Sequence, residues 1–235
     1  MKIKKPFKIM IIALGIITSI LILVFISNTL KFYRVPTPSN EPTIMQGAYI
    51  FSTNLKKPNR FDFICYNFDD QISKAIFVKR LCGLPGDTLE IRKGDLFVNN
   101  KSVDHLFSLY HKYFISPPNL EDLLKTSFDK KNIIEGPNLE FNDGDTVFTV
   151  LLSKEWVLDK NINAVRSIMA INTNEGTLSD EFNKSWNIDN FGPIVIPEKK
   201  YFVLGDSREN TLDSRHSGYI DESDLIGTVL KNWTF

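Results

Sequence analysis

The sequence predicts a mainly β fold behind a single N-terminal transmembrane helix. An uncharged, apolar run at residues 9–30 is long enough to cross a bilayer as a helix. After it come short segments rich in β-branched and aromatic residues, separated by turns that contain Gly, Pro, Asn and Asp. Segments with this punctuation are typical of antiparallel strands joined by hairpins.

The composition is that of a globular protein with a substantial hydrophobic core. Of the 235 residues, 43% are hydrophobic and 24% are charged, and the 28 basic residues balance the 28 acidic ones. A net charge of zero gives no support to nucleic-acid binding. The two cysteines, Cys65 and Cys82, are too few for a disulfide scaffold, and they form either one bond or two buried thiols.

Residues 9–30 are expected to be an uncleaved membrane anchor. A helix of these 22 residues would reach roughly 33 Å. A cleavable secretory signal would have a shorter apolar region and a small-x-small site, which the end of this run lacks. The lysines before the run outweigh Lys31 and Arg34 after it, so the positive-inside rule predicts a cytoplasmic N-terminus at residues 1–8. Those lysines are Lys2, Lys4, Lys5 and Lys8.

Several segments after the anchor have the composition of strands. They are short and rich in β-branched and aromatic residues, and polar turns separate them. In the turns at 93–95 and 99–100, Gly, Asp and Asn tolerate the positive φ that tight hairpins require. The expected strands are residues 48–51, 61–66, 75–81, 88–92 and 96–98.

Residues 104–190 are less clearly patterned. Ser116-Pro117-Pro118-Asn119 before residues 120–124 predicts a short capped helix. Asn142-Asp143-Gly144-Asp145 is a turn that leads into an expected strand at 146–151. Beyond this region the pattern sharpens again, with a strand expected at 201–204 and a further patterned segment at 225–229.

A proline-rich stretch at residues 36–43, P-T-P-S-N-E-P-T, follows the anchor closely. Its three prolines fix φ and remove backbone donors, which excludes regular helix and central strand. We expect a rigid extended loop that presents the hydroxyl of Ser39 at its middle. Taken alone, however, the stretch favours a proline-stiffened linker.

Two further stretches change that interpretation: K-R-L-C-G-L-P-G-D at 79–87 and G-D-S-R-E-N-T-L-D-S-R at 205–215. Singly, they are typical of a basic pair at a strand end and of a plain turn. In this order and behind an anchor, the three stretches resemble the type I signal peptidases, a serine–lysine family that cleaves leader sequences from exported proteins. There the family reads P-S-x-S-M-x-P-T-L, K-R-x-x-G-x-P-G-D and G-D-N-x-x-x-S-x-D-S-R. The resemblance covers residues 33–100 and 187–230, besides the anchor.

The resemblance implies a role for each matching residue. Ser39 falls on the family's nucleophile and Lys79 on its general base. Thr37 takes the position of a hydroxyl that helps the Ser39 backbone N–H to bind the oxyanion, and Thr211 that of a serine that hydrogen-bonds the base. The remaining motif residues are expected to support the site structurally, Asp213 and Arg215 as an ion pair: Arg80, Gly205, Asp206, Asp213 and Arg215.

These residue types suit the chemistry. A serine hydroxyl attacks at neutral pH only if a neighbour takes its proton. An exposed lysine, with a pKa of about 10.4, is protonated and cannot do so, but burial can lower its pKa by several units. The flanks of Lys79, residues 75–78 and Leu81, can supply an apolar pocket, and alternation places Phe77 on its side of the strand.

The sequence departs from the family pattern at four positions. Asn40 replaces the Met after the nucleophile, which in the family sits at the substrate-binding surface and the apolar membrane-facing rim, so a change in affinity or specificity is expected. Ser207 replaces the Asn of the third motif. Thr replaces Ser at positions 37 and 211, which keeps the hydroxyl but stiffens χ1.

Other catalytic classes find less support. None of the three histidines, His105, His111 and His216, lies in a G-x-S-x-G setting, although His216 is near the third motif. H-E-x-x-H motifs and Cys/His clusters are also missing, so neither a metal site nor a cofactor is expected.

The leading hypothesis is a membrane-anchored serine endopeptidase that removes signal peptides from exported preproteins after small-x-small sites. It would lie in the bacterial inner (cytoplasmic) membrane with its catalytic domain on the extracytoplasmic, periplasmic side. The resemblance implies an antiparallel β catalytic domain at residues 31–103 and 191–235, into which 104–190 are inserted as a smaller, β-rich, cap-like subdomain. It also implies shallow S1 and S3 pockets for small side chains.

The expected partners are the signal peptides of preproteins and membrane lipid, while the oligomeric state is left open. Two alternatives remain open. The first is a catalytically weak or inactive membrane-tethered β domain that binds leader peptides or an envelope protein, motivated by Asn40 and Ser207. The second is a dedicated peptidase of one secretion or pilus system.

Overall fold

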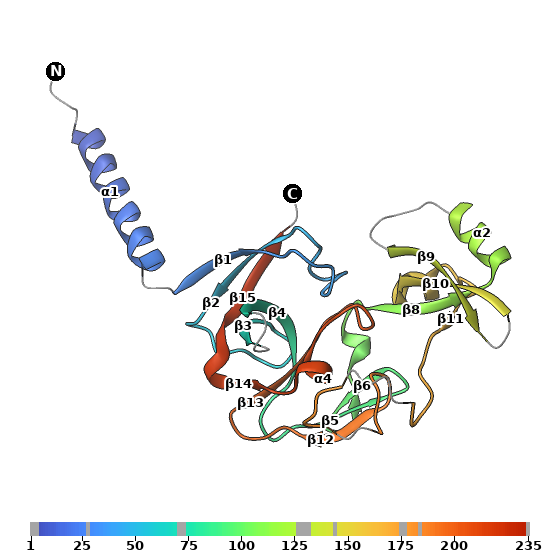
Figure 1. Ribbon diagram of the computed structural model, residues 1–235. Coiled ribbons are helices and arrows are strands. Elements are labelled where there is room, and N and C mark those ends of the chain that lie inside the picture. Colours follow the sequence, from blue (N-terminus) through green and yellow to red (C-terminus); the bar gives the residue numbers. More distant parts are fainter. Residues whose placement is uncertain are drawn as a thin grey trace.

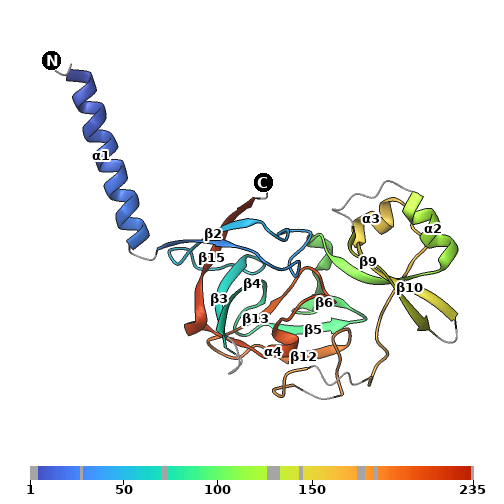
Figure 2. The same ribbon diagram turned by 45° about the horizontal axis from the view of Figure 1, so that its top comes forward.

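The computed structural model describes residues 5–26, 29–69, 74–125, 133–142, 145–173, 178–182 and 185–233. It contains an isolated N-terminal helix and three β-sheets whose named strands all pair antiparallel, so the predicted fold class is confirmed. The helix stands away from the β body, and one four-stranded sheet forms a lobe on the opposite side of that body (Figures 1 and 2).

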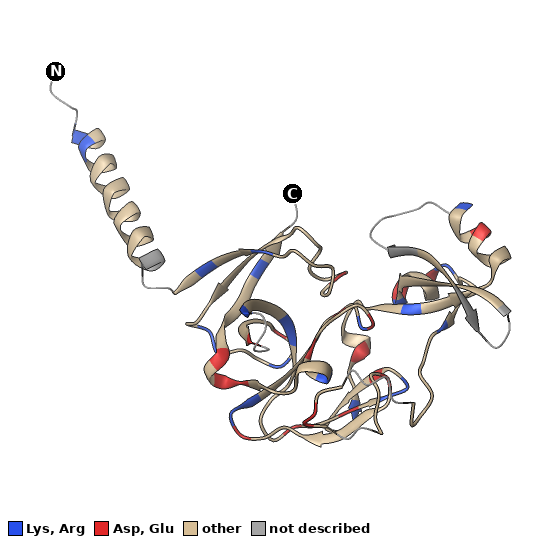
Figure 3. Cartoon of the chain, in the orientation of Figure 1, with Lys and Arg blue, Asp and Glu red and all other residues tan. Residues whose placement is uncertain are grey.

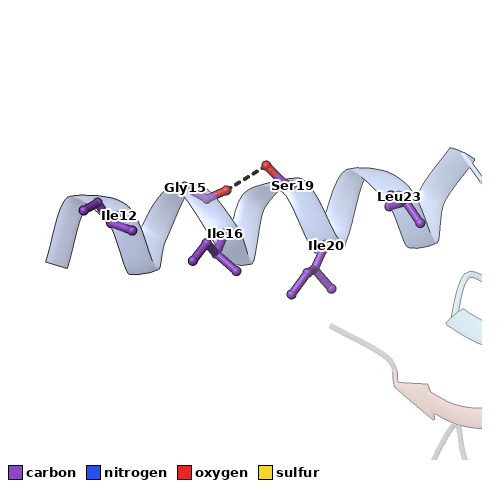
Figure 4. Close-up of a pocket in the computed structure, with 6 residues that line it drawn as sticks. All are labelled: Ile12, Gly15, Ile16, Ser19, Ile20 and Leu23. Atoms are coloured by element: carbon purple, nitrogen blue, oxygen red, sulfur yellow. Dashed lines mark hydrogen bonds between the residues drawn. The ribbon is translucent and has the colours of Figure 1, made fainter. Parts of the chain in front are cut away.

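Helix α1, Lys5–Ile26, has the length and apolarity of a membrane-spanning helix over Lys5–Leu23. Its charged residues lie at its start and none follows along the helix (Figure 3). Thr18 and Ser19 both donate their hydroxyls to the carbonyl of Gly15, the second at 2.8 Å (Figure 4). Their polar groups are therefore satisfied within the helix, as a bilayer requires.

The helix bounds differ from the expected span of residues 9–30. Helix α1 begins earlier, at Lys5, and Leu30 belongs to strand β1, where it pairs with Thr53. Leu30 satisfies its backbone in a strand ladder, which hydropathy alone does not reveal. Lys2, Lys4 and residues 27–28 lie outside the described residues.

The largest sheet has seven strands in the order β1-β2-β15-β3-β4-β13-β14. The C-terminal strand β15 lies between β2 and β3, so both ends of the chain contribute to one sheet (Figure 1). Phe61, expected to begin a strand, instead has φ of 77° in the turn before β3. The bounds are β1 Leu30–Arg34, β2 Tyr49–Thr53, β3 Phe63–Asp69, β4 Lys74–Gly83, β13 Lys200–Leu204, β14 Ile220–Asp221 and β15 Leu225–Trp233.

A second sheet, in the order β12-β5-β6-β7, contains the predicted hairpins. Lys93 and Gly94 have φ of 50° and 78°, and Asn99 and Asn100 have φ of 51° and 61°. Two consecutive positive φ values are the mark of type I′ hairpin turns, which explains these residue choices. The strands are β5 Thr88–Arg92, β6 Asp95–Val98, β7 Lys101–Ser102 and β12 Phe191–Val195.

The third sheet, in the order β11-β8-β10-β9, has its own hydrophobic cluster beneath α2 and α3. The expected helix at 120–124 is part of α2 and the expected strand at 146–151 is part of β10, while residues 143–144 of the expected turn lie outside the described residues. The division at residues 104 and 190 stays a prediction. The elements are β8 Tyr110–Ile115, α2 Pro117–Lys125, β9 Ile133–Asn142, β10 Asp145–Ser153, α3 Lys154–Asp159 and β11 Val165–Arg166.

Three short helices complete the described elements: the 3₁₀ helices Asp104–Leu106 and Glu222–Asp224, and α4 Ser214–Ser217. Cys65 and Cys82 are both free and buried, and they belong to different hydrophobic clusters. Of the two alternatives, the structure therefore contains two buried thiols.

Candidate active site

The proline-rich loop is a series of turns and not the expected extended segment. The backbone N–H of Glu41 donates to the carbonyl of Pro38 at 3.0 Å, and that of Ile44 donates to Asn40 at 2.9 Å. These bonds fold the loop back on itself, since proline removes its own donor but leaves carbonyls free to accept. The turns bury Ser39, which is only 6% exposed.

Ser39 and Lys79, 40 residues apart in the sequence, are in direct contact. The Lys79 Nζ donates a hydrogen bond of 2.6 Å to the Ser39 Oγ, and Lys79 is 4% exposed. Lys79 lies on β4, and pairing with β3 fixes the backbone of that strand. The proline-rich loop at residues 36–43, called the serine loop from here on, packs against β4. The structure thus brings together the two residues that the resemblance pairs.

Burial of Lys79 lowers its pKa to about 8, because an ammonium group loses hydration in an apolar site. The negative charges of Asp213 and Asp206 act in the opposite direction and limit this shift. Phe77, two residues earlier on β4, has its ring centroid 5.6 Å from the amine, as strand alternation predicts. A neutral amine is therefore well populated near pH 8 and can accept a proton.

The two threonines of the site differ in their contacts. Thr37 Oγ1 is 3.2 Å from Ser39 Oγ, within hydrogen-bond distance. Thr211 lines the same groove as Ser39 and Lys79, but its Oγ1 is buried with no hydrogen-bond partner among the described residues. The expected bond from Thr211 to Lys79 is absent, because this hydroxyl packs against the backbone at Gly205 and the amine donates to Ser39.

Gly205 allows the third motif, residues 205–215, to approach the serine loop. A Cβ added here would lie 2.5 Å from the carbonyl oxygen of Ser39 and 2.3 Å from Thr211 Oγ1. Two residues later, the N–H of Ser207 donates to the same Ser39 carbonyl at 3.2 Å. The absence of a side chain at Gly205 is therefore what lets the two backbones bond.

Arg80 and Asp206 join the second and third motifs by a buried ion pair. The Arg80 Nε donates to Asp206 Oδ1 at 2.7 Å, and a second guanidinium nitrogen donates to Oδ2. The guanidinium carbon also lies 4.3 Å from the ring centroid of Phe63 and 4.4 Å from that of Phe107. Thr43 donates its hydroxyl to the same carboxylate and thereby attaches the serine loop to this pair.

Asp213 and Arg215 form the ion pair that the sequence predicts, with two contacts of 2.9 Å. Burial acts to raise the pKa of Asp213, but the charge and hydrogen bonds of Arg215 outweigh it and lower this pKa. Asp213 also accepts from the backbone N–H of Gly205 at 3.2 Å. The pair therefore fixes the backbone of the third motif beside the serine loop.

Asn40 is not on the surface where the resemblance led us to expect it. Its side chain is fully buried, and its Nδ2 donates to the carbonyl of Val78 at 2.8 Å. The turn after Ser39 directs this side chain inward, against β4. The expectation that Asn40 forms part of the substrate-binding surface is therefore wrong for this structure.

A groove of about 510 Å³ opens beside Ser39 and Lys79. Most of its wall is apolar, and it comes from the serine loop, β4 and the third motif. Its lining residues include Val35, Pro36, Ala75, Ile76, Val78 and Leu212. The groove is large enough for a few residues of an extended peptide with small side chains.

Sequence reasoning missed Glu209, which lines the groove and connects it to the third sheet. Its carboxylate lies 3.2 Å from His111 Nδ1 and accepts from the backbone N–H of Lys112 on β8. Arg166 also contacts His111, at 2.9 Å. The acidic residue within the third motif was a visible signal, but its partner 98 residues away was not.

The histidines take part in other contacts. His111 is paired with Glu209, and His216 lies 3.6 Å from Asp213. Within the described ranges there is also no cluster of three or more His, Cys, Asp or Glu side chains arranged to hold a metal ion.

Comparison with known proteins gives one consistent family. The family model described as signal peptidase, peptidase S26, matches residues 4–234. Signal peptidase I of Buchnera aphidicola subsp. Baizongia pistaciae is 30% identical, over 91% of this chain and 73% of that protein. Signal peptidase I P of Bacillus subtilis subsp. natto is 28% identical, over 88% and 80%. A crystal structure of a signal peptidase I from Enterococcus faecalis V583 aligns with 74% of this chain and 97% of its own, at 24% identity and a TM-score of 0.33.

Proposed function

Because this chain belongs to the signal peptidase family, peptidase S26, we propose that Ser39 is its nucleophile and Lys79 its general base. The protein is a type I signal peptidase, a serine endopeptidase that removes signal peptides from preproteins. One observation carries the assignment of the two residues: the buried 2.6 Å hydrogen bond between Lys79 Nζ and Ser39 Oγ.

In the proposed reaction, neutral Lys79 takes the proton of Ser39 as its Oγ bonds to the scissile carbonyl carbon. The oxyanion that forms accepts hydrogen bonds from the Ser39 backbone N–H and the Thr37 hydroxyl, each worth roughly 3 kcal/mol. Protonated Lys79 then gives its proton to the leaving amine as the C–N bond breaks, leaving an ester on Ser39. Water, deprotonated by Lys79, hydrolyses this ester and releases the signal peptide.

The groove supports the proposed preference for small-x-small sites. Its wall is mostly apolar, and the Glu209 carboxylate in it is already engaged by His111 and Lys112. An extended peptide with alternating small residues would pack against the segment 75–78 with those side chains directed inward.

We further propose that the β body lies on the extracytoplasmic face of the inner membrane and contacts its lipid. The lysines at the start of the chain support a cytoplasmic N-terminus. Next to the anchor, the ring of Phe32 stacks on Tyr49 at 5.1 Å, and Phe51 contacts Trp233 at 4.9 Å. Tyr and Trp favour the membrane–water interface, so this aromatic group suits a surface that rests on lipid.

The test is cleavage of a preprotein with an A-x-A site by the purified full-length protein in detergent. Ser39→Ala and Lys79→Ala should each abolish cleavage, while Lys200→Ala, which removes a half-buried lysine paired with Asp221, should retain it. If either site variant cleaves at the wild-type rate, the assigned roles are wrong. Binding of the precursor by the wild type without turnover would instead favour the binding-module hypothesis.

A further inference from the structure

Asn40 and Val78 form a contact that directly flanks the catalytic pair. Asn40 follows Ser39 in the chain, and Val78 precedes Lys79. The bond from Asn40 Nδ2 to the Val78 carbonyl, 2.8 Å long, therefore joins the backbone next to the nucleophile to the backbone next to the base. A side chain in this position controls the distance between the two groups without touching substrate.

The segment of β4 around Val78 has an open edge at this point. Strand β13 pairs with β4 only from Arg80 to Gly83, so it does not cover that edge before residue 80. At this open edge, the Asn40 side chain donates a hydrogen bond to the Val78 carbonyl. On the other side of the pair, Arg80 donates to the hydroxyl of Thr43 at 3.2 Å. Side-chain bonds to β4 on both sides of Lys79 thus hold the serine loop.

The reaction itself requires a restraint other than the catalytic hydrogen bond. When Ser39 Oγ bonds to the scissile carbon, its proton passes to Lys79 and then to the leaving amine, so the hydrogen bond between the two side chains changes from step to step. The Asn40–Val78 bond is not consumed in any step, so it keeps the two backbones together until the ester is hydrolysed. Misplacement of reacting groups by about 1 Å can cost about a hundredfold in rate, which makes such a restraint valuable.

Stability alone does not account for an asparagine here. The Oδ1 of Asn40 is buried and has no hydrogen-bond partner among the described residues, which is unfavourable by itself. An apolar side chain at position 40 would remove this cost, but it would leave the Val78 carbonyl without its side-chain donor. The side-chain amide of Asn40 is therefore better explained by a role in holding the serine loop in place than by a contribution to the free energy of folding.

We propose that Asn40 is a positioning residue that attaches the serine loop to strand β4 and so sets the geometry of Ser39 and Lys79. This inference rests on the proposed function of these two residues. It accounts for the departure from the family pattern, since an amide donor gives a directional bond that the family's Met at this position cannot make.

The test compares Asn40→Leu, which keeps a branched outline without a donor, and the smaller Asn40→Ala with the wild type. We expect kcat to fall by about 10- to 100-fold with little change in KM. We also expect the acid limb of the pH–rate profile to move to higher pH, because a loosened Lys79 amine regains water. The matched control is Asn187→Leu, since Asn187 is also buried and donates to a backbone carbonyl, that of Ala170, outside the groove. It should lower the melting temperature and leave the profile in place.

An unmoved acid limb in both Asn40 variants, or a raised KM with unchanged kcat, would overturn the inference. Titration of Lys79 by ¹³C NMR, after labelling of the lysine amines, measures the same restraint without substrate. Failure of the wild type to cleave any preprotein would refute the proposed function, while the NMR comparison would still decide the role of Asn40.

Discussion

Asp206→Asn is expected to destabilise the protein while shifting its activity to lower pH. Asp206 is 1% exposed and accepts two hydrogen bonds from Arg80 and one from Thr43. The substitution keeps the shape of the side chain but leaves the Arg80 charge buried without a counterion. Removing one partner of a buried pair costs about 3–5 kcal/mol, and since Asn retains one acceptor we expect the lower end of that range. For a domain of this size, about 3 kcal/mol lowers the melting temperature by about 6–12 °C.

The pH effect follows from the charge that Asp206 places near the base. Burial lowers the pKa of Lys79 to about 8, and Asp213 and Asp206 oppose this shift. With that pKa, about one Lys79 in ten is neutral at pH 7. Loss of the Asp206 charge lowers the pKa further, so a larger fraction of Lys79 is neutral at pH 7. Relative to its own alkaline plateau, the variant should therefore be more active at pH 7 than the wild type.

Two measurements on the detergent-solubilised protein check both parts: a thermal melt and the pH–rate profile of preprotein cleavage. Asp87→Asn is the matched control, since Asp87 is a buried acid paired with Arg60 that does not act on Lys79. It should lower the melting temperature without moving the acid limb. An acid limb that stays in place or moves to higher pH in Asp206→Asn would refute the electrostatic reasoning.

Four further outcomes are expected. Gly205→Ala should cut kcat at least tenfold, because the added Cβ would lie 2.5 Å from the carbonyl oxygen of Ser39 in the serine loop. Preprotein cleavage assays measure this. Burial raises the pKa of Cys65 to about 11 and that of Cys82 to about 12, so maleimide should label neither until the protein unfolds, as mass spectrometry would show. The lowered pKa of Asp213 stabilises the fold above the ordinary value of about 3.9, and melts at falling pH should show this stability lost as pH approaches the lowered pKa. Arg215→Ala should remove about 3–5 kcal/mol at neutral pH.

Local features of the sequence were sufficient for much of the fold. Turn residues such as Gly94 and Asn100 predicted hairpins, because the positive φ that they adopt is a property of the residue itself. The apolar run predicted the N-terminal helix in the same way, although its bounds shifted where Leu30 entered a strand. In residues 104–190, strand β8 was not predicted, since its partner β10 lies far along the chain and the local pattern does not reveal it. Strand β9 was also not predicted, although it pairs with β10, the next strand in the sequence.

For the site, the sequence by itself determined the residue types, and the resemblance supplied the pairing of Ser39 with Lys79. Only the tertiary structure decided that this pair lies 2.6 Å apart in a buried pocket, which lowers the pKa of the lysine. It also turned Asn40 inward and left Thr211 without its expected partner. Contacts across 40 to 172 residues depend on how the strands pack and on how closely two backbones approach, and no spacing within one stretch of sequence contains that information.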